Sequence, residues 1–223
     1  MKNVTLTACL YLLVANVTFA QIIPEFPDGI YYSHEELKNK TPGSTTKLQI
    51  IKRTGGDIVW AGGNDYKLVS LNDSIKPRFI RTKVYAYATN DSIFLNCNFH
   101  GLQQMFALCL TRGNFLAFKA CMSNGDASSY AVLGGALLAA SLSNIRYLYV
   151  LSLRTGNAKK LDANYVSTRL EENKILQAQF EAEPDKKSDA VLLKYIDLLN
   201  GFILPNSQPP VDSSDLEPKR KRK

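Results

Sequence analysis

The stretch SSYAVLGGALLAASLSNIRYLYVLSLRT, from Ser128 to Thr155, decides the fold class because its two halves carry different apolar patterns. The first half contains a run from Val132 to Leu142 that is apolar except for Ser141. A helix that is apolar on every side is normally buried, and this run is shorter than the roughly 20 residues that cross a bilayer. We therefore expect a buried helix rich in Gly and Ala. The alternative is a helix that associates with a membrane or dimerises through Gly135 and Ala139.

The second half, Ile145–Leu153, alternates as a β-strand does. Its odd-numbered residues, which include two tyrosines and two leucines, share one face, and its even-numbered residues, which include Leu148 and Val150, share the other. Because both faces are largely apolar, the pattern predicts an interior strand. The segment Arg154–Asn157 that follows has the composition of a turn.

Residues 1–20 have the features of a secretory signal sequence. Lys2 supplies the positive start, Leu6–Val17 is the apolar core, and Thr18-Phe19-Ala20 fits the small-x-small pattern that precedes cleavage. The mature chain is therefore expected to begin at Gln21. Export to the periplasm or the outer envelope follows from this prediction.

Composition divides the rest of the chain into a folded region and a tail. Residues 21–204 suit one α+β domain, with a strand-rich part at 21–127 and a helix–strand–helical part at 128–204. From residue 205 the chain is rich in proline and polar residues and is expected to be disordered. Lys219–Lys223 are all basic and dominate the net charge of +7. The folded part is therefore near neutral, so we expect no nucleic acid partner; the basic tail can contact an anionic envelope surface or another envelope protein.

Residues 47–121 are predicted to form a series of short strands separated by turns rich in Gly, Asn and Asp, at 54–57, 61–65, 89–91 and 112–114. No strand–helix alternation typical of a parallel sheet is present, so we expect an antiparallel sheet or open barrel. The predicted strands are Leu48–Arg53, Ile58–Trp60, Lys67–Leu71, Arg78–Ile80, Lys83–Ala88, Ser92–Cys97, Met105–Leu110 and Phe115–Cys121.

Helices are predicted near both ends of the domain. Ser33 and Glu36 have the spacing of a capping box at the start of a short helix. Asp162–Glu183 is expected to be a helical stretch. Its predicted inner face consists of Leu170, Ile175, Leu176 and Phe180.

A last helix is predicted over Ala190–Asn200. Ser188 or Asp189 is expected to cap its first turn, and Gly201 stands where a glycine commonly follows the end of a helix.

Two groups of short motifs resemble an uncharacterised family of exported Bacteroidota proteins. The first is Asp28-Gly29-Ile30-Tyr31-x-Ser33-x-x-Glu36-Leu37, followed by Pro42. The second runs from Gly134-Gly135 through Arg146-x-Leu148-Tyr149-Val150-Leu151 and Thr155-Gly156 to Tyr195-Ile196-x-x-Leu199-Asn200. The likeness spans most of the mature chain. It implies export and no established activity, so no catalytic residue is carried over.

Residues that could carry chemistry are few and scattered. Cys97 and His100 form a C-x-x-H pair, but a structural zinc site needs four ligands, and the sequence offers no second pair. His34 lies in the first turn of a polar helix. The acidic residues near it occupy turn and capping positions: Asp28, Glu35 and Glu36. We therefore assign no catalytic, metal-binding or cofactor-binding residue.

The three cysteines of the mature chain are expected to be structural thiols. If Gly113-Asn114 forms a hairpin loop, Cys109 lies opposite Phe118 and Cys121 lies opposite Phe106. Because register and face are coupled in a sheet, the two cysteines then point to opposite faces and cannot form a disulfide. A Cys97–Cys109 disulfide stays open, because the loop 98–104 leaves that register undetermined.

The leading hypothesis for function is a non-enzymatic, envelope-associated binding or assembly module. It rests on the signal sequence, the strand-rich body and the lack of catalytic motifs. One alternative is an envelope hydrolase with dispersed catalytic residues, using an Asp, a Glu or His100 in a cleft. Another is a peripheral membrane component that uses Val132–Leu142 or the basic tail.

Overall fold

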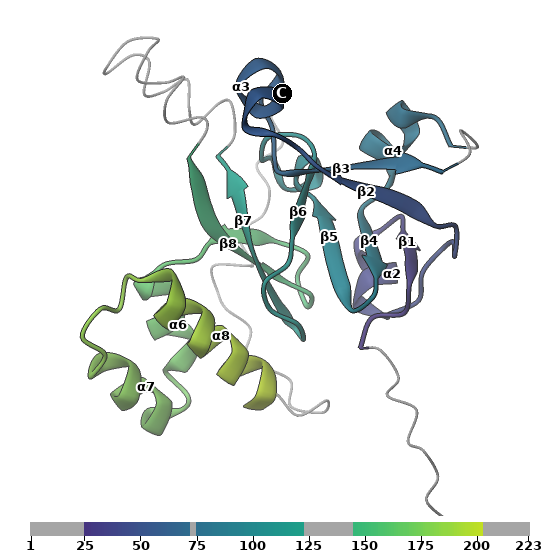
Figure 1. The fold of residues 1–223 in the computed structure, drawn as a ribbon. Coiled ribbons are helices and arrows are strands. Elements are labelled where there is room, and N and C mark those ends of the chain that lie inside the picture. Colours follow the sequence, from purple (N-terminus) through teal and green to yellow (C-terminus); the bar gives the residue numbers. More distant parts are fainter. Residues whose placement is uncertain (1–24, 72–74, 123–144, 203–223) are drawn as a thin grey trace, which may run out of the picture.

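The computed structural model describes residues 25–71, 75–122 and 145–202, which form two antiparallel sheets and several helices (Figure 1). The α+β class and the antiparallel pairing predicted from the sequence are confirmed. The predicted signal sequence, the Val132–Leu142 helix and the basic tail lie outside the described residues.

The larger sheet has six strands in the order β1-β4-β5-β6-β3-β2 and curls into a half-barrel. Its strands are β1 Gly29–Tyr31, β2 Leu48–Lys52, β3 Tyr66–Ser70, β4 Ala86–Thr89, β5 Ser92–Asn96 and β6 Phe106–Leu108. The smaller sheet consists of β7 Phe115–Cys121, β8 Arg146–Ser152 and β9 Ala158–Lys160. β8 lies between the other two strands, which confirms the predicted interior strand.

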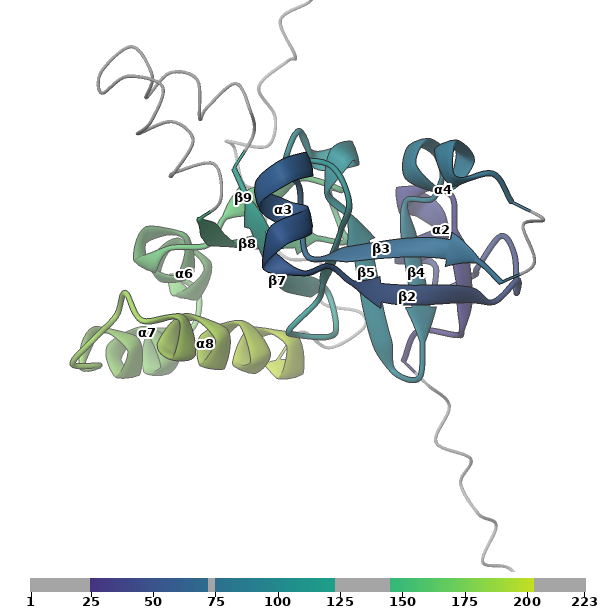
Figure 2. The same ribbon diagram turned by 45° about the horizontal axis from the view of Figure 1, so that its top comes forward.

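The helices lie at opposite ends of the molecule. Figures 1 and 2 show α6, α7 and α8 together beside the smaller sheet, whereas α3 and α4 lie at the far side, next to β2 and β3. The helices are α2 His34–Lys38, α3 Gly55–Ala61, α4 Pro77–Lys83, α6 Ala163–Leu170, α7 Lys174–Glu181 and α8 Asp189–Phe202, and a 3-10 turn covers Cys97–His100.

Three apolar clusters hold these layers together. The first fills the concave side of the half-barrel, where Tyr87, Phe94 and Phe106 meet Ile80 of α4. The second lies between the two sheets and includes Leu95 and Phe118. The third joins the other face of the smaller sheet to α6, α7 and α8. A strand that is covered on both faces must be apolar on both faces. In the smaller sheet β8 is such a strand.

The half-barrel is drawn together by contacts between strands that are not neighbours in the sheet. The main chains of Ile30 and Ser44 exchange two hydrogen bonds, of 2.7 and 3.2 Å. From β4, the buried hydroxyl of Tyr87 accepts from Leu48 N at 3.0 Å and donates to Leu48 O at 3.3 Å. These bonds attach the β1–β4 side of the sheet to β2.

Two of the predicted strands are wrong, because Ile58–Trp60 and Arg78–Ile80 belong to α3 and α4. The predicted turn at 54–57 is the start of α3, where Thr54 and Asp57 form a reciprocal capping box. Pro77 occupies the first turn of α4, where its fixed φ favours a helix. In both places the capping signal outweighs the β-propensity of the residues that follow.

The expected helical stretch Asp162–Glu183 is divided into α6 and α7. Asn173 begins α7 by accepting from Leu176 N, which separates the axes of the two helices and turns Ile175 outward. Ile175 is 73 % exposed, so its assignment to the inner face is wrong, whereas the other three residues of that face are buried. Ser188 caps the last helix through Val191 N. Gly201 lies within α8 rather than after it.

The capping box predicted at the first helix forms only in part. Ser33 Oγ accepts from Glu36 N at 3.2 Å, as expected. The Glu36 carboxylate, however, accepts from Tyr32 N at 2.6 Å, one residue before the cap. This bond ties the end of β1 to the start of α2.

The segment between β6 and β7 has the register predicted from Gly113-Asn114, because Cys109 lies opposite Phe118. The two strands then diverge into different sheets. Thr111 Oγ1 occupies the opening, donating to Phe115 O and accepting from Ala117 N, both at 2.8 Å.

The expected pairing of Cys121 with Phe106 is wrong, since Phe106 pairs with β3 and β5 instead. The Cys121 N–H donates to Asn64 Oδ1 at 2.7 Å. Asn64 Nδ2 donates to Gln103 O at 2.6 Å. The Asn64 amide therefore binds the Cys121 N–H at the place where a continuous hairpin would have paired Cys121 with Phe106.

Candidate functional site

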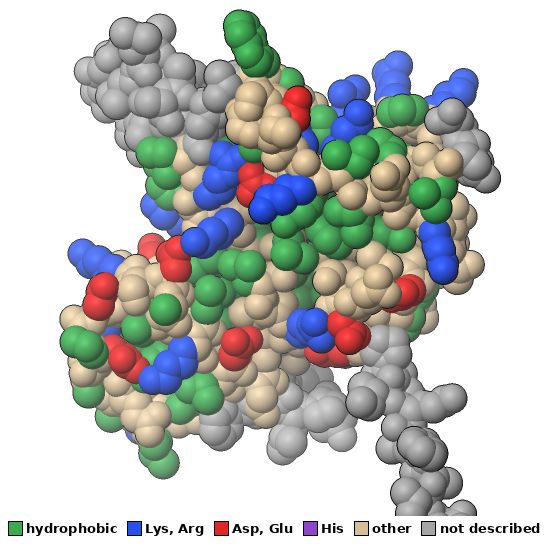
Figure 3. Space-filling view, in the orientation of Figure 1, with side chains coloured by type: hydrophobic (Ala, Val, Ile, Leu, Met, Phe, Trp, Pro, Cys, Tyr) green, Lys and Arg blue, Asp and Glu red, His purple; other side chains and the backbone are tan. Residues whose placement is uncertain are grey.

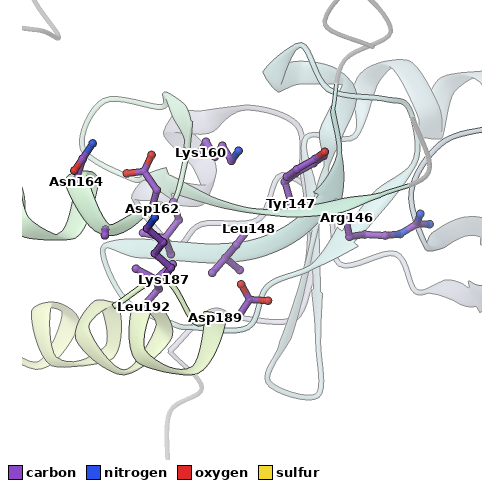
Figure 4. A pocket seen from close by; sticks show the side chains of 11 residues that line it. Arg146, Tyr147, Leu148, Lys160, Asp162, Asn164, Lys187, Asp189 and Leu192 are labelled. Carbon is purple, nitrogen blue, oxygen red and sulfur yellow. The ribbon is translucent and has the colours of Figure 1, made fainter. Parts of the chain in front are cut away.

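A groove of about 360 Å³ opens between the smaller sheet and the helical layer. Its lining comes from the start of β8, the end of β9 and the starts of α6 and α8. Figure 4 shows Tyr147 and Lys160 on one side of the strands β8 and β9, and Leu148, Lys187 and Asp189 on the other side, next to α8. The polar and aromatic residues of the lining are Arg146, Tyr147, Lys160, Asp162, Asn164, Lys187 and Asp189.

The fold places these residues for local reasons. Asp162 is the N-cap of α6, and its Oδ1 accepts from Tyr165 N at 2.9 Å. Leu161 N donates to Leu148 O at 2.8 Å, which continues the pairing of β9 with β8 up to that cap. The groove is therefore the corner where a strand pair ends and two helices begin.

Ion pairs already engage several charges around the groove. Asp189 Oδ2 lies 2.7 Å from Lys119 Nζ. Arg146 Nε donates to Asp65 Oδ1 at 3.0 Å. With Asp162 acting as a cap, the charges that remain at the groove are the ammonium groups of Lys160 and Lys187, neither of which forms an ion pair with a described residue.

The electrostatic setting of the groove favours a negative group. Lys160 Nζ lies 4.7 Å from the centroid of the Tyr147 ring, so the ring holds this cation at the edge of the sheet. The N-terminal ends of α6 and α8 lie at the groove, and a helix N-terminus carries partial positive charge. Carboxylates at such ends are stabilised, which explains the positions of Asp162 and Asp189.

A second hollow lies between α7 and α8, but its polar groups bind one another. Glu183 Oε1 accepts from Lys194 Nζ at 2.6 Å and from the Tyr195 hydroxyl at 3.2 Å. These bonds lower the pKa of Glu183, with the Lys194 hydrogen bond as the largest cause. A site whose charges are matched internally offers less to a ligand than the groove beside Lys160 and Lys187.

The Cys97–His100 pair singled out in the sequence lies in the 3-10 turn and faces the core between the sheets. Burial raises the pKa of the Cys97 thiol well above its usual value and lowers the pKa of His100 to about 4. A nucleophile requires a thiolate and a base near neutral pH. This environment favours neither.

The remaining sequence candidates have structural partners. His34 Nε2 lies 2.8 Å from Leu153 O, and Asp28 Oδ1 accepts from Asn90 N at 3.1 Å. Glu35 lies 3.5 Å from His34 Nδ1 on the exposed side of α2. Cys97, Cys109 and Cys121 are free thiols. Within the described ranges, no three His, Cys, Asp or Glu side chains converge in a way that could hold a metal ion.

The sequence reasoning missed the groove because its residues belong to no motif. Lys160 and Lys187 are separated by 26 residues, and only the pairing of β8 with β9 and the return of α8 bring them together. A weak signal was present in Asp162 and Asp189, because acidic residues at two predicted helix starts mark the helix ends that meet there.

No helix within 25–71, 75–122 and 145–202 has the length and apolarity required to cross a membrane. Comparison with curated proteins and with solved structures found no match for the chain. Comparison with family models matched residues 29–202, which include every strand and helix described above. The chain therefore belongs to the family of unknown function DUF6563.

Proposed function

We propose that this chain is an exported, envelope-associated binding module that holds an acidic group of its ligand in the groove between β8–β9 and α6–α8. The observation that carries this proposal is that Lys160 and Lys187 both line one groove, together with the starts of two helices. Cations and helix N-termini both stabilise a bound anion.

The neighbouring side chains suit binding rather than catalysis. Leu148, Ala163 and Leu192 provide apolar lining, and Tyr147 lies beside Lys160; a mostly apolar lining is common in ligand sites. The carboxylates of Asp162 and Asp189 are engaged by Tyr165 N and by Lys119. Among the described residues that line the groove there is no His, Cys or Ser to act with them as a nucleophile or base.

The location in the envelope is supported by residues 1–20, which have the features of a secretory signal. N-terminal sequencing of the protein from a periplasmic fraction should begin at Gln21. Recovery of the chain from the soluble cytoplasm with Met1 intact would contradict export and leave the groove to be judged by binding alone.

The groove is tested by thermal unfolding of the mature chain with matched acidic and neutral probes. Galacturonate would be compared with galactose, and a Glu-rich peptide with its Gln-rich counterpart. A ligand at 100 times its Kd adds about 2.7 kcal/mol to the free energy of unfolding. We expect an acidic probe to raise the melting temperature and its neutral partner to have no effect.

Charge reversal identifies where such a probe binds. Lys160→Glu combined with Lys187→Glu should abolish the shift, whereas Lys174→Glu, at the exposed start of α7, should keep it. If no acidic probe stabilises the chain, or if the double variant responds as the wild type does, the groove is not the binding site.

A further inference from the structure

The single tryptophan of the chain, Trp60, is also its most exposed large apolar side chain among the described residues, at 90 % exposure. It lies near the end of α3, which projects at the top of the body in Figure 1. Figure 3 shows an apolar side chain standing out at the same place. Tryptophan has a large apolar area with one polar handle, and is enriched where a surface meets a protein or a membrane interface.

Hydrogen bonds hold α3 in this position. The Thr54–Asp57 capping box fixes its first turn. The Arg53 guanidinium donates to Asp57 O at 2.9 Å and to Asn64 O at 2.8 Å, attaching the helix to the buried junction of the two sheets. The exposed position of Trp60 is therefore set by the fold.

The surface next to α3 is basic. The elements α3, β2, β3 and α4 contain five Lys or Arg residues and one carboxylate, Asp57, which is engaged in the capping box. Figure 3 shows Lys and Arg side chains along this edge and over α4. None of the five forms an ion pair with a described residue; they are Lys52, Lys67, Arg78, Arg81 and Lys83.

Exposed apolar side chains lie among these cations. Phe79 of α4 is 43 % exposed, and Leu71, which follows β3, is 65 % exposed. Only Ile80 of α4 is buried. Basic groups mixed with exposed aromatic and aliphatic side chains match the two attractions of a membrane surface, which are anionic headgroups and the acyl boundary beneath them.

We propose that the face formed by α3, the β2–β3 hairpin and α4, here called the α3–α4 face, docks on an anionic phospholipid membrane. Trp60 and Phe79 enter the headgroup level, and four cations lie against the lipid phosphates: Lys52, Arg78, Arg81 and Lys83. Lys67 points to the opposite face of the β2–β3 pair, because it lies across from Ile51 rather than Lys52. A protein partner is less well matched, because interface anchors normally sit at the centre of a packed patch, whereas Trp60 stands apart at the tip of a projecting helix.

Because Trp60 is the only tryptophan, its fluorescence reports on this face alone. The mature chain would be mixed with vesicles of phosphatidylcholine, or of phosphatidylcholine with phosphatidylglycerol. We expect a blue shift of the emission and protection from a soluble quencher with the anionic vesicles only. The shift should weaken as salt is raised, because salt screens exposed charges.

Variants locate the contact. Each basic side chain near an anionic surface increases the partition coefficient roughly fivefold, so Arg78→Gln with Arg81→Gln should weaken vesicle binding by about 25-fold. Lys38→Gln with Lys174→Gln removes the same charge from α2 and α7, and should have little effect. Trp60→Ala should weaken binding in co-sedimentation, whereas Ile175→Ala, another exposed apolar residue, should not.

Three results would overturn the proposal. The first is no binding to anionic vesicles. The second is binding during which Trp60 emission stays that of a water-exposed indole, which would assign the contact to another part of the chain. The third is equal loss of binding in the α4 and control pairs, which would show a non-specific charge effect. The groove variants at Lys160 and Lys187 should bind vesicles as the wild type does, so this test is separate from that of ligand binding.

Discussion

Replacement of Asn64 tests whether the buried amide at the junction joins the two sheets. Asn64 is 1 % exposed, and its side chain accepts from Cys121 N of β7 and donates to Gln103 O before β6. Asn64→Leu keeps the number and branching of the side-chain heavy atoms but can make neither bond. The substitution therefore removes the polar contacts at this point while keeping the space filled.

The size of the effect follows from the bonds that are lost. The buried Cys121 N–H would lose its acceptor, which costs about 1–3 kcal/mol, and the lost amide bond to Gln103 O adds about 1 kcal/mol. We therefore expect a loss of about 2–4 kcal/mol from a total free energy of unfolding that is typically about 5–15 kcal/mol. With a urea m-value of about 2 kcal/mol/M, the midpoint should fall by about 1–2 M.

Urea titration followed by far-ultraviolet circular dichroism measures this loss, with Asn98→Leu, at an exposed position of the 3-10 turn, as the control. Asn64→Asp is a second variant of the same shape. It keeps the acceptor for Cys121 N but places an oxygen against Gln103 O, so its loss of stability relative to the wild type should be larger at pH 7 than at pH 4, where the carboxyl is protonated. Equal midpoints for Asn64→Leu and Asn98→Leu would refute the structural role.

Other consequences of the packing can be tested separately. Burial lowers the pKa of His100 from 6.5 to about 4. Between these pH values the unfolded chain therefore binds a proton that the folded chain does not. The free energy of unfolding should fall by up to about 3 kcal/mol as the pH decreases from about 6.5 to 4. Denaturant titrations of His100→Gln should show a flatter dependence, and an unchanged slope would contradict this origin. Gly113 has a φ of +109°, and an added Cβ would lie 2.7 Å from Asn200 Cγ, so Gly113→Ala should cost about 1–3 kcal/mol and lower the melting temperature, whereas Gly55→Ala, which meets open space, should not. Burial raises the pKa of the Cys97 thiol, so a water-soluble disulfide reagent at neutral pH should modify it only after unfolding; rapid reaction of the native thiol would show that it is accessible.

The sequence predicted those parts of the fold that local patterns determine. Alternation on both faces identified β8 as interior, and Gly113-Asn114 was sufficient to place Cys109 opposite Phe118. The prediction failed at α3 and α4 because two or three residues of high β-propensity were weighed above the helix-start signals that precede them. The Thr54–Asp57 spacing and Pro77 carried the correct signal, and each is a recognised start of a helix.

Contacts between segments that are distant in the sequence could not be predicted from local patterns. Asn64 is of a residue type common in loops, and its burial depends on where β6 and β7 separate. The groove has the same origin, since only the tertiary fold brings Lys160 and Lys187 into the lining of one groove. The sequence predicted the elements that contain these residues. It did not predict that the ends of these elements lie next to one another in the fold.

The bond between Tyr87 and Leu48 also affects how molecules of this protein meet one another. β2 is an edge strand, and an unpaired edge invites strand addition from a second molecule, which leads to aggregation. At Leu48 both main-chain polar groups are taken by the Tyr87 hydroxyl, so an incoming strand finds no free donor or acceptor there. Lys47 and Lys52 flank the strand with like charges. The same contact that draws the half-barrel together therefore shields its edge, and Tyr87→Phe should show this as increased self-association at high protein concentration.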